Sequence, residues 1–334
     1  MFIVQSYPIA ILFCFITMLC WGSWANTQKL AAGRWRFELF YWDYVIGILF
    51  TSLVAAFTIG SIGDKGRGFV ADLQQVSAIN ILSALLAGLI FNLANILLTA
   101  AIAIAGMSVA FPVGIGIALI LGVLVNYVSV QKGSPVLLFS GVLIVAAAII
   151  MNAVAYRKKS ITRREPGSKG ILLSVIAGIL MSFFYRFIAA SMDVNHFDAP
   201  APTKMTPYTA FTIFAAGIFV SNLLFNTILM KRPLDGGRVS YRDYFKGRLS
   251  LHAVGFLGGI IWGIGNLFNL LAAEKAGPAI SYGLGQGATL IAAIWGVLIW
   301  KEFSNMGRQV GWLLAGMFGC FLIGIALIIL AGQS

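Results

Sequence analysis

Side-chain amides stand in the middle of long apolar runs of this sequence, where they could hydrogen bond a solute. Asn92 and Asn95 lie in one run, and Asn266 and Asn269 lie in another. Both pairs are spaced by three residues, so the two members of a pair share one face of a helix. An amide offers both donors and acceptors and carries no charge. The pairs therefore indicate either binding of a small, neutral, polar solute or hydrogen bonds that hold helices together.

A third apolar run carries a tyrosine and a glutamine among glycines. Tyr282 and Gln286 are four residues apart, and Gly283, Gly285 and Gly287 surround them. The glycines allow a close approach of helices or a kink that turns the glutamine toward a cavity. Helix packing would explain the glycines but not the glutamine, so Gln286 is the principal candidate for a solute contact.

Aromatic side chains could stack on a flat solute. Trp21 and Trp24 flank a Gly-Ser pair. A tryptophan near the end of a spanning helix is often an interfacial anchor, which is our interpretation of Trp24, whereas Trp21 is deep enough for solute binding. Tyr185 and Tyr208 complete the set of substrate-binding candidates.

Three ionisable residues lie within or at the ends of apolar runs. Asp43 stands at the start of one run, Arg186 lies deep in another, and Glu274 ends a third. A buried arginine needs a partner, and an ion pair between Arg186 and Glu274 is one option. Proton coupling would need a carboxylate that titrates as access alternates, a role open to Asp43 or Glu274. Interfacial ion pairs and passive facilitation remain alternatives.

The sequence contains no motif for a catalytic, metal or cofactor site. The three cysteines lie in apolar runs without metal-ligand spacing, and His196 and His252 are far apart. The Gly-Ser-Lys-Gly at 167–170 lacks the rest of the phosphate-binding pattern. We therefore expect no catalytic residue, no metal and no cofactor, and a protein that is not an enzyme.

The composition indicates that lipid surrounds the elements that must position these residues. The chain of 334 residues is 60% hydrophobic and 10% charged, whereas soluble domains carry about 25% charged residues. The net charge of +12 comes from basic residues in loops between apolar runs. Such loops are typical of membrane topology signals, so we expect no nucleic-acid partner.

Ten runs are long enough to span a bilayer, for which about 20 apolar residues suffice. The predicted helices are Pro8–Gln28, Phe40–Gly60, Ile79–Ala103, Met107–Val128, Pro135–Tyr156, Gly170–Met192, Pro207–Met230, Leu251–Glu274, Pro278–Trp300 and Arg308–Leu330.

The distribution of basic residues predicts the orientation of these helices. The loops after the first, third, fifth, seventh and ninth helices hold 17 Lys and Arg residues, and the other side holds 5. The richer side is expected in the cytoplasm, which leaves both termini outside. We therefore expect a multi-pass protein of the plasma or inner membrane.

The two halves of the chain resemble each other at a shift of 171 positions. Gly88 then aligns with Gly259, and Asn95 aligns with Asn266. An odd number of helices per half inverts the second half, the arrangement that permits alternating access around a central site. The predicted organisation is a first five-helix repeat at 1–156, a cytoplasmic linker at 157–169 and a second repeat at 170–334. The fold class is an all-α membrane protein with ten transmembrane helices as a 5+5 inverted repeat.

Several short motifs resemble the plant ureide permeases, within the drug/metabolite transporter superfamily. They are Tyr41-Trp42-Asp43-Tyr44, the stretch 55–63, Pro207-Tyr208-Thr209-Ala210-Phe211, Gly263-Ile264-Gly265-Asn266, and Trp295-Gly296-Val297-Leu298 followed by Lys301-Glu302-Phe303. The resemblance runs along most of the chain, and bacterial glucose/ribose and rhamnose permeases are neighbouring branches. It implies ten helices, an inverted repeat and proton-linked uptake of allantoin, uracil and related heterocycles. The central loop departs from the plant pattern because it is short and lacks a phosphate-loop-like sequence.

Together these features predict a permease that moves a small polar metabolite by alternating access. A ureide or nucleobase is the first choice, and a sugar or an exported metabolite is the alternative. The expected partners are this solute, the lipid bilayer and, where transport is coupled, protons. The oligomeric state is open.

Overall fold

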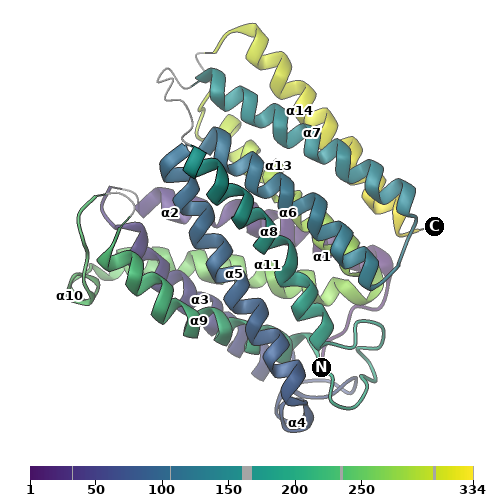
Figure 1. Cartoon of the computed structure of the whole chain (residues 1–334). Coiled ribbons are helices and arrows are strands. Elements are labelled where there is room, and N and C mark those ends of the chain that lie inside the picture. The colour runs from purple at the N-terminus through teal and green to yellow at the C-terminus, as the bar shows by residue number, and fades with distance from the viewer. Residues whose placement is uncertain (32, 106, 160–167, 234–235, 304–305, 334) are drawn as a thin grey trace.

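The computed structural model describes residues 1–31, 33–105, 107–159, 168–233, 236–303 and 306–333. Every regular element in these ranges is a helix, and the helices form one elongated bundle (Figure 1). The elements are α1 (Tyr7–Ser23), α2 (Ala25–Ala31), α3 (Phe37–Phe57), α4 (Phe69–Gln75), α5 (Ala78–Ala105), α6 (Met107–Ser129), α7 (Pro135–Lys159), α8 (Ser168–Ser191), α9 (Pro207–Lys231), α10 (Tyr241–Phe245), α11 (Leu249–Ala276), α12 (Pro278–Gln286), α13 (Ala288–Ile294), the π-helix η1 (Trp295–Ile299) and α14 (Arg308–Ala331).

The predicted all-α membrane class is confirmed in its coarse form. Nine helices in the described residues are long and apolar enough to cross a membrane. All nine begin and end within three residues of predicted spans. The remaining predicted span, Met107–Val128, coincides with α6, in which the apolar stretch Val113–Ser129 is shorter.

Two predicted helices are not continuous. The first is interrupted at Trp24, between α1 and α2, and the ninth is interrupted at Gly287, between α12 and α13. At Gly287 the backbone N–H donates to the carbonyl of Leu284, and the N–H of Leu290 donates to the carbonyl of Gly287, so the ladder tightens to three-residue turns. Glycines in the sequence indicated the deviation at Gly287, whereas the one at Trp24 was not predicted. The short helices α4 and α10 were not predicted either.

Long helices pack in pairs drawn from different parts of the chain. α5 lies against α8 and α9, whereas α11 lies against α1 and α3. α6 packs on α8, and α12 and α13 pack on α1. α7 and α14 lie side by side along one edge of the bundle (Figure 1). The contacts of the two halves correspond to each other. The α5–α8 contact corresponds to α11–α1, the α5–α9 contact to α11–α3, and the α6–α8 contact to those of α12 and α13 with α1.

The closest helix contacts are made by glycines at equivalent places in the two halves. A methyl group on Gly88 would overlap the carbonyl oxygen of Phe214, beside Gly217 of α9. A methyl group on Gly259 would overlap the carbonyl oxygen of Tyr44 and lie 2.9 Å from the Cα of Gly47. Apolar side chains gain little free energy when they exchange lipid contacts for protein contacts, so helices in a membrane associate mainly where small residues let their backbones approach closely.

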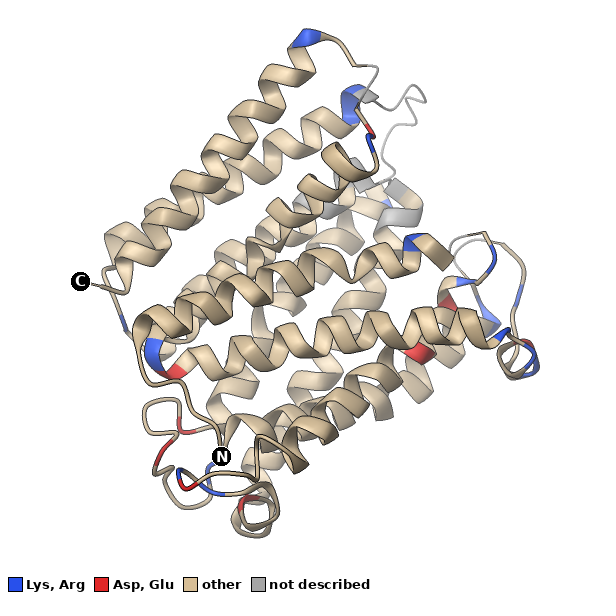
Figure 2. Cartoon of the chain, turned by 180° about the vertical axis from the view of Figure 1, so that it is seen from behind, with Lys and Arg blue, Asp and Glu red and all other residues tan. Residues whose placement is uncertain are grey.

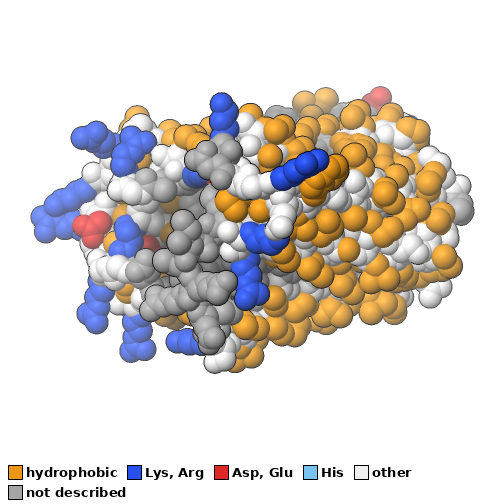
Figure 3. All heavy atoms as spheres, turned by 90° about the horizontal axis from the view of Figure 1, so that it is seen from above, with side chains coloured by type: hydrophobic (Ala, Val, Ile, Leu, Met, Phe, Trp, Pro, Cys, Tyr) orange, Lys and Arg blue, Asp and Glu red, His pale blue; other side chains and the backbone are white. Residues whose placement is uncertain are grey.

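Charged residues are concentrated in the loops and at helix ends, and the helix sides are apolar. Figure 2 shows this distribution along the bundle. In the view from above in Figure 3, hydrophobic side chains cover much of the right part of the face, and the Lys and Arg side chains lie at its left and centre. Leu143, Ile150 and Leu322 are among the large apolar residues that remain exposed, which is the expected state of a surface that faces lipid.

At the end of the bundle that holds the N-terminus, a charged cluster joins two loops. Arg67 forms an ion pair with Asp72 at 3.0 Å and donates to the carbonyl oxygens of Pro200 and Lys204. Asp72 also accepts a hydrogen bond from the backbone N–H of Thr206 at 2.8 Å. These contacts hold the segment before α5 against the segment before α9.

We predict that Gly259→Ala destabilises the protein and that Gly319→Ala does not. The added methyl group at position 259 meets backbone atoms that cannot rotate away, which should cost roughly 1–3 kcal/mol. A methyl group at position 319 would have no atom within 4 Å. Thermal unfolding of the purified variants measures this difference, and equal unfolding temperatures would contradict the proposed tight α3–α11 contact.

Candidate solute-binding cavity

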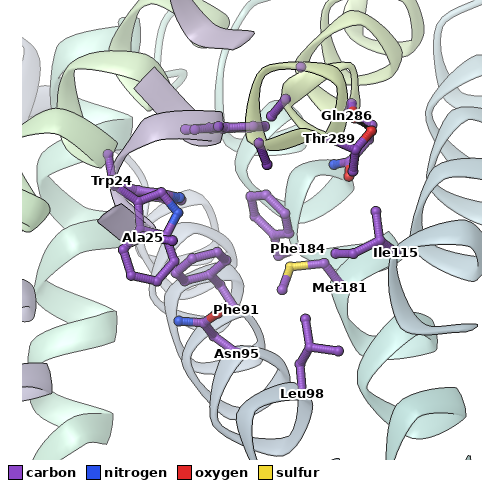
Figure 4. Close-up of a pocket in the computed structure, with 16 residues that line it drawn as sticks. Trp24, Ala25, Phe91, Asn95, Leu98, Ile115, Met181, Phe184, Gln286 and Thr289 are labelled. Carbon is purple, nitrogen blue, oxygen red and sulfur yellow. Dashed lines mark hydrogen bonds between the residues drawn. The ribbon is translucent and has the colours of Figure 1, made fainter. Parts of the chain in front are cut away.

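A cavity of about 160 Å³ lies in the middle of the bundle. Its walls come from α1, α2, α5, α6, α8, α11, α12 and α13. The lining residues are Trp21, Gly22, Trp24, Ala25, Phe91, Asn95, Leu98, Ile115, Met181, Phe184, Trp262, Gly285, Gln286, Ala288, Thr289 and Ala292 (Figure 4). None of these side chains is ionisable, so the cavity suits a neutral solute.

Both helix interruptions coincide with the cavity. Trp24 and Ala25 line it at the junction of α1 and α2, and Gln286 and Ala288 line it at the junction of α12 and α13. The backbone at both junctions stays in the right-handed helical region, so each span continues through its junction with a local change of hydrogen bonding. A local deviation of this kind at membrane depth is tolerated where it lines a cavity.

Aromatic rings give the cavity flat walls. The ring of Trp262 is parallel to that of Trp21 within 11°, at a centroid distance of 5.8 Å, and it lies 4.6 Å from the ring of Phe91. Phe91 in turn lies 5.2 Å from Phe184. An engineered apolar cavity of roughly 150 Å³ accommodates benzene. The space is therefore suited to a solute with one flat ring.

Gln286 supplies an uncommitted amide to the cavity. Its side chain is only 8% exposed and makes no hydrogen bond with any residue that the structure describes. Thr289 donates its hydroxyl to the backbone carbonyl of Gln286 at 3.0 Å, so that hydroxyl is already used. The side-chain amide of Gln286 can thus both donate to and accept from a bound molecule.

Asn95 approaches the cavity from another side than Gln286 (Figure 4). A buried hydrogen-bond network holds its side chain. Its Nδ2 donates to the hydroxyl of Tyr41 at 3.1 Å, and that hydroxyl donates to Oδ1 of Asn92 at 2.9 Å. Nδ2 of Asn92 donates to Oγ of Ser221 at 3.0 Å. The network orients Asn95 and leaves its Oδ1 without a hydrogen-bond donor among the described residues. Asn92 itself lies behind the cavity wall.

Three other predicted site residues form a buried polar layer beside the cavity. Tyr282 donates to the carbonyl oxygens of Ala118 and Met181, at 3.1 and 3.3 Å. Tyr185 shares a 3.0 Å hydrogen bond with Ser281, and Asn269 donates to the carbonyl of Ser281 at 2.8 Å. The two tyrosine hydroxyls are satisfied by the protein, whereas Oδ1 of Asn269 has no partner among the described residues, and none of the three side chains lines the cavity.

Two predicted site residues lie elsewhere. Tyr208 donates to the carbonyl of Phe2 at 3.0 Å, near the N-terminus and away from the cavity lining. Asn266 is fully buried, and neither atom of its amide has a hydrogen-bond partner in the described part of the chain.

Asp43 lies in a cluster between α3, α10 and α11. Its Oδ1 accepts from the hydroxyl of Tyr244 at 2.6 Å and lies 2.8 Å from Nδ1 of His252. The indole N–H of Trp35 donates to Oδ2 at 3.2 Å. Burial, followed by the hydrogen bond to and the charge of Asp43, raises the pKa of Tyr244 above its ordinary value, so this phenol remains a donor.

The two other ionisable candidates do not pair with each other. The carboxylate of Glu274 forms an ion pair with Lys275 at 2.7 Å, and its carbonyl accepts from Lys132. Arg186 has no ion pair with any described residue. The optional Arg186–Glu274 pair is therefore absent from the described contacts: Lys275 contacts Oε1 of Glu274, and Oε2 has no partner among the described residues.

The structure adds residues to the site that the sequence analysis did not select. Phe91, Trp262 and Phe184 form the flat walls, and Trp24 lines the cavity, where its ring lies 4.7 Å from that of Tyr44. Phe91 and Trp262 occupy equivalent positions of the two halves, at the same shift of 171 as Asn95 and Asn266. The same shift in the sequence could therefore have identified Phe91 and Trp262 as a matched pair beside the two asparagines.

Comparisons with known proteins place these features in a family context. A family model described as ureide permease matches residues 40–166 and 158–331. Ureide permease 1 of Arabidopsis thaliana is 23% identical over 98% of this chain and 98% of its own length. Ureide permease 5 of the same plant is 24% identical over 98% of this chain and 95% of its own length.

A protein of Streptococcus pyogenes serotype M6, named "Putative sugar uptake protein", is 27% identical over 61% of this chain and 70% of its own length. A solved crystal structure has a TM-score of 0.66 at 17% identity, over 98% of this chain and 100% of that chain. The structural likeness shows that the two chains share a fold.

We predict that Tyr41→Phe and Tyr44→Phe have opposite effects on stability. Removing the Tyr41 hydroxyl leaves both Asn92 and Asn95 short of a partner, and each unsatisfied buried group costs about 1–3 kcal/mol. The hydroxyl of Tyr44 is buried without a partner among the described residues, so its removal should be neutral or stabilising. Unfolding temperatures of the two purified variants test this directly, and a loss in Tyr44→Phe as large as in Tyr41→Phe would refute the assigned network.

Proposed function

The chain belongs to the ureide permease family, and from this premise we propose that it moves a ureide or nucleobase, such as allantoin or uracil, by alternating access. It is a multi-pass membrane protein and a transporter. Its matched relatives are named for permeation and uptake and not for catalysis.

The observation that carries the proposal is the free amide of Gln286 in a neutral, flat-walled cavity. A ureide or a nucleobase presents an N–H and a C=O on one edge of a planar ring. The amide of Gln286 could pair with that edge through two hydrogen bonds, and the free Oδ1 of Asn95 could accept from a second N–H. Trp24, Phe91 and Trp262 would stack on the ring faces.

A sugar is the second candidate. The bacterial relative is named for sugar uptake, and amides with aromatic rings also bind sugars. A sugar would need many hydrogen-bonding partners around its hydroxyl groups. The free cavity-facing amide groups in the described lining are those of Gln286 and Asn95, which favours the planar heterocycle. Export in place of import is compatible with the same site.

We propose that the transporter contains ten spans as a 5+5 inverted repeat, with repeats at 1–156 and 170–334. The paired glycine contacts support this organisation, because Gly88 and Gly259 differ by 171 positions and Gly47 and Gly217 differ by 170. The exchange of helix partners between the halves supports it further. The proposed linker, 157–169, lies in part outside the described residues.

The proposed orientation puts both termini outside the cell and the α10 end in the cytoplasm. Lys231, Arg232, Arg238, Arg242 and Lys246 are exposed at that end. Their concentration supports this orientation under the positive-inside rule, and with it a plasma or inner membrane location.

Proton coupling is part of the proposal, with Asp43 and His252 as the proton-binding pair. Oδ1 of the buried Asp43 lies 2.8 Å from Nδ1 of His252, so a proton could be held between the two side chains. Tyr244 and Trp35 complete the cluster. Glu274 is less suited to this role because Lys275 already neutralises it.

We predict that Gln286→Leu abolishes solute binding and uptake while the protein still inserts and folds. The variant keeps the volume of the side chain but removes both hydrogen-bonding groups. A thermal-shift screen of the purified protein with ureides, nucleobases, nucleosides and sugars measures binding, since a bound solute stabilises the folded state by mass action. Asn152→Leu is the matched control, because it removes an amide on α7 that lies outside the cavity lining and whose Oδ1 is buried without a partner among the described residues. Uptake by Gln286→Leu at the wild-type rate would show that Gln286 does not bind the solute.

We predict that dissipating the proton gradient stops accumulation of the solute, and that the substitution Asp43→Asn also stops it. Asp43→Asn should still exchange labelled for unlabelled solute, because the cavity is intact, but should lose concentrative uptake. Reconstituted vesicles with an imposed pH gradient report both activities. Accumulation that persists without a gradient would remove protons from the scheme.

A further inference from the structure

Asn95 and Asn266 occupy equivalent positions of the two halves but lie in opposite environments. Each follows an aromatic cavity residue by four positions, Phe91 on α5 and Trp262 on α11. Asn95 lines the cavity and is held by Tyr41. Asn266 is sealed at 0% exposure, and both its Nδ2 and its Oδ1 lack a partner among the described residues.

A difference between the halves explains why Asn266 is unpartnered. Tyr41 on α3 stands six residues before Gly47, and the residue six before Gly217 on α9 is Phe211. Phe211 is fully buried and its ring has no hydroxyl. The network that orients Asn95 in the first half therefore has no equivalent around Asn266.

Sealing an unpaired amide costs free energy, because the group gives up water and gains nothing in return. On the same helix, Asn269 donates its Nδ2 to the carbonyl of Ser281, although its Oδ1 has no partner among the described residues. Asn222 on α9 is likewise fully buried with neither amide atom partnered there. What distinguishes Asn266 is that it combines an unpaired amide with the position equivalent to Asn95, which lines the cavity.

Trp21 lies between the cavity and this part of α11. A methyl group on Gly265 would be 2.8 Å from Cδ1 of the indole, and one on Gly285 would be 2.8 Å from its Cζ3. The ring is thus packed on two glycines, one of which precedes Asn266. Its Nε1 is buried and, like the amide of Asn266, has no partner in the described ranges. Movement of this one ring would bring an indole donor and an amide toward the cavity together.

We propose that Asn266 and the indole N–H of Trp21 bind the polar edge of the solute in the opposite-facing state, in which Asn95 is withdrawn from the cavity. The ligand class is a neutral planar ring with adjacent N–H and C=O groups. This inference rests on the proposed function. It adds that the two equivalent asparagines serve in turn, one in each state of the transport cycle.

The substitution Asn266→Leu separates this role from a structural one. Leucine preserves the volume and removes the unpaired polar groups, so the unfolding temperature should be unchanged or higher. The thermal shift produced by uracil or allantoin should be retained, because Asn266 is outside the observed cavity. Transport should fall by more than tenfold. Asn95→Leu, in contrast, should lose both the shift and transport. Uptake at the wild-type rate by a folded Asn266→Leu protein would overturn the proposal.

Cysteine labelling keeps the proposal testable if Asn266→Leu does not fold. In a chain whose Cys14, Cys20 and Cys320 are replaced, Asn95→Cys and Asn266→Cys should react with an impermeant maleimide from opposite faces of the membrane. Labelling of both from the same face, or no labelling of position 266 from either face, would reject the exchange. A wild-type protein that neither binds nor moves any screened solute would instead refute the proposed function, while leaving the labelling pattern as an independent result.

Discussion

The close contact of helix backbones at paired glycines is the constraint on which the rest of the structure depends. In lipid, apolar side chains gain little by moving from acyl chains to other side chains, so helices associate through tight packing and polar contacts. Gly88 with Gly217, and Gly259 with Gly47, bring α5 onto α9 and α11 onto α3 without intervening side chains. Two rigid helix pairs result, and they meet around the centre of the bundle.

The cavity follows from the register of these contacts. Phe91 stands three residues after Gly88, and Trp262 stands three residues after Gly259. Both rings therefore lie near the glycine faces of their helices, and they meet at 4.6 Å as the cavity wall. The broken helices α1–α2 and α12–α13 close the remaining sides and expose Gln286. Regular helices thus supply the flat apolar walls, and the irregular ones supply the uncommitted polar group.

The sequence predicted the helices well because each depends on local composition. Runs of apolar residues in lipid leave the backbone no alternative to helical hydrogen bonds, so the predicted and observed spans mostly coincide. Gln286 and Asn95 were found because an amide within such a run is costly. Tyr282 and Tyr185 are also buried polar groups, but the protein supplies partners for their hydroxyls, and no pattern in the sequence distinguishes the two cases. The interruption at Trp24 has no proline or glycine at its centre, so sequence alone did not reveal it.

Helix α3 carries the two polar networks of the first half on different sides. Tyr41 faces Asn92 and Asn95 of α5, whereas Asp43, two residues on, faces His252 of α11 and Tyr244 of α10. Residues two apart on a helix are separated by about 200° around its axis. The same short segment therefore contacts the residue that lines the cavity on one side and a buried acid–imidazole pair on the other. Because Gly47 fixes α3 against α11 one turn farther on, a change at Asp43 cannot be absorbed by separation of those helices at that point. Along α3 two neighbouring side chains contact residues that line the cavity: the ring of Tyr44 packs on Trp24, and the hydroxyl of Tyr41 accepts from Asn95.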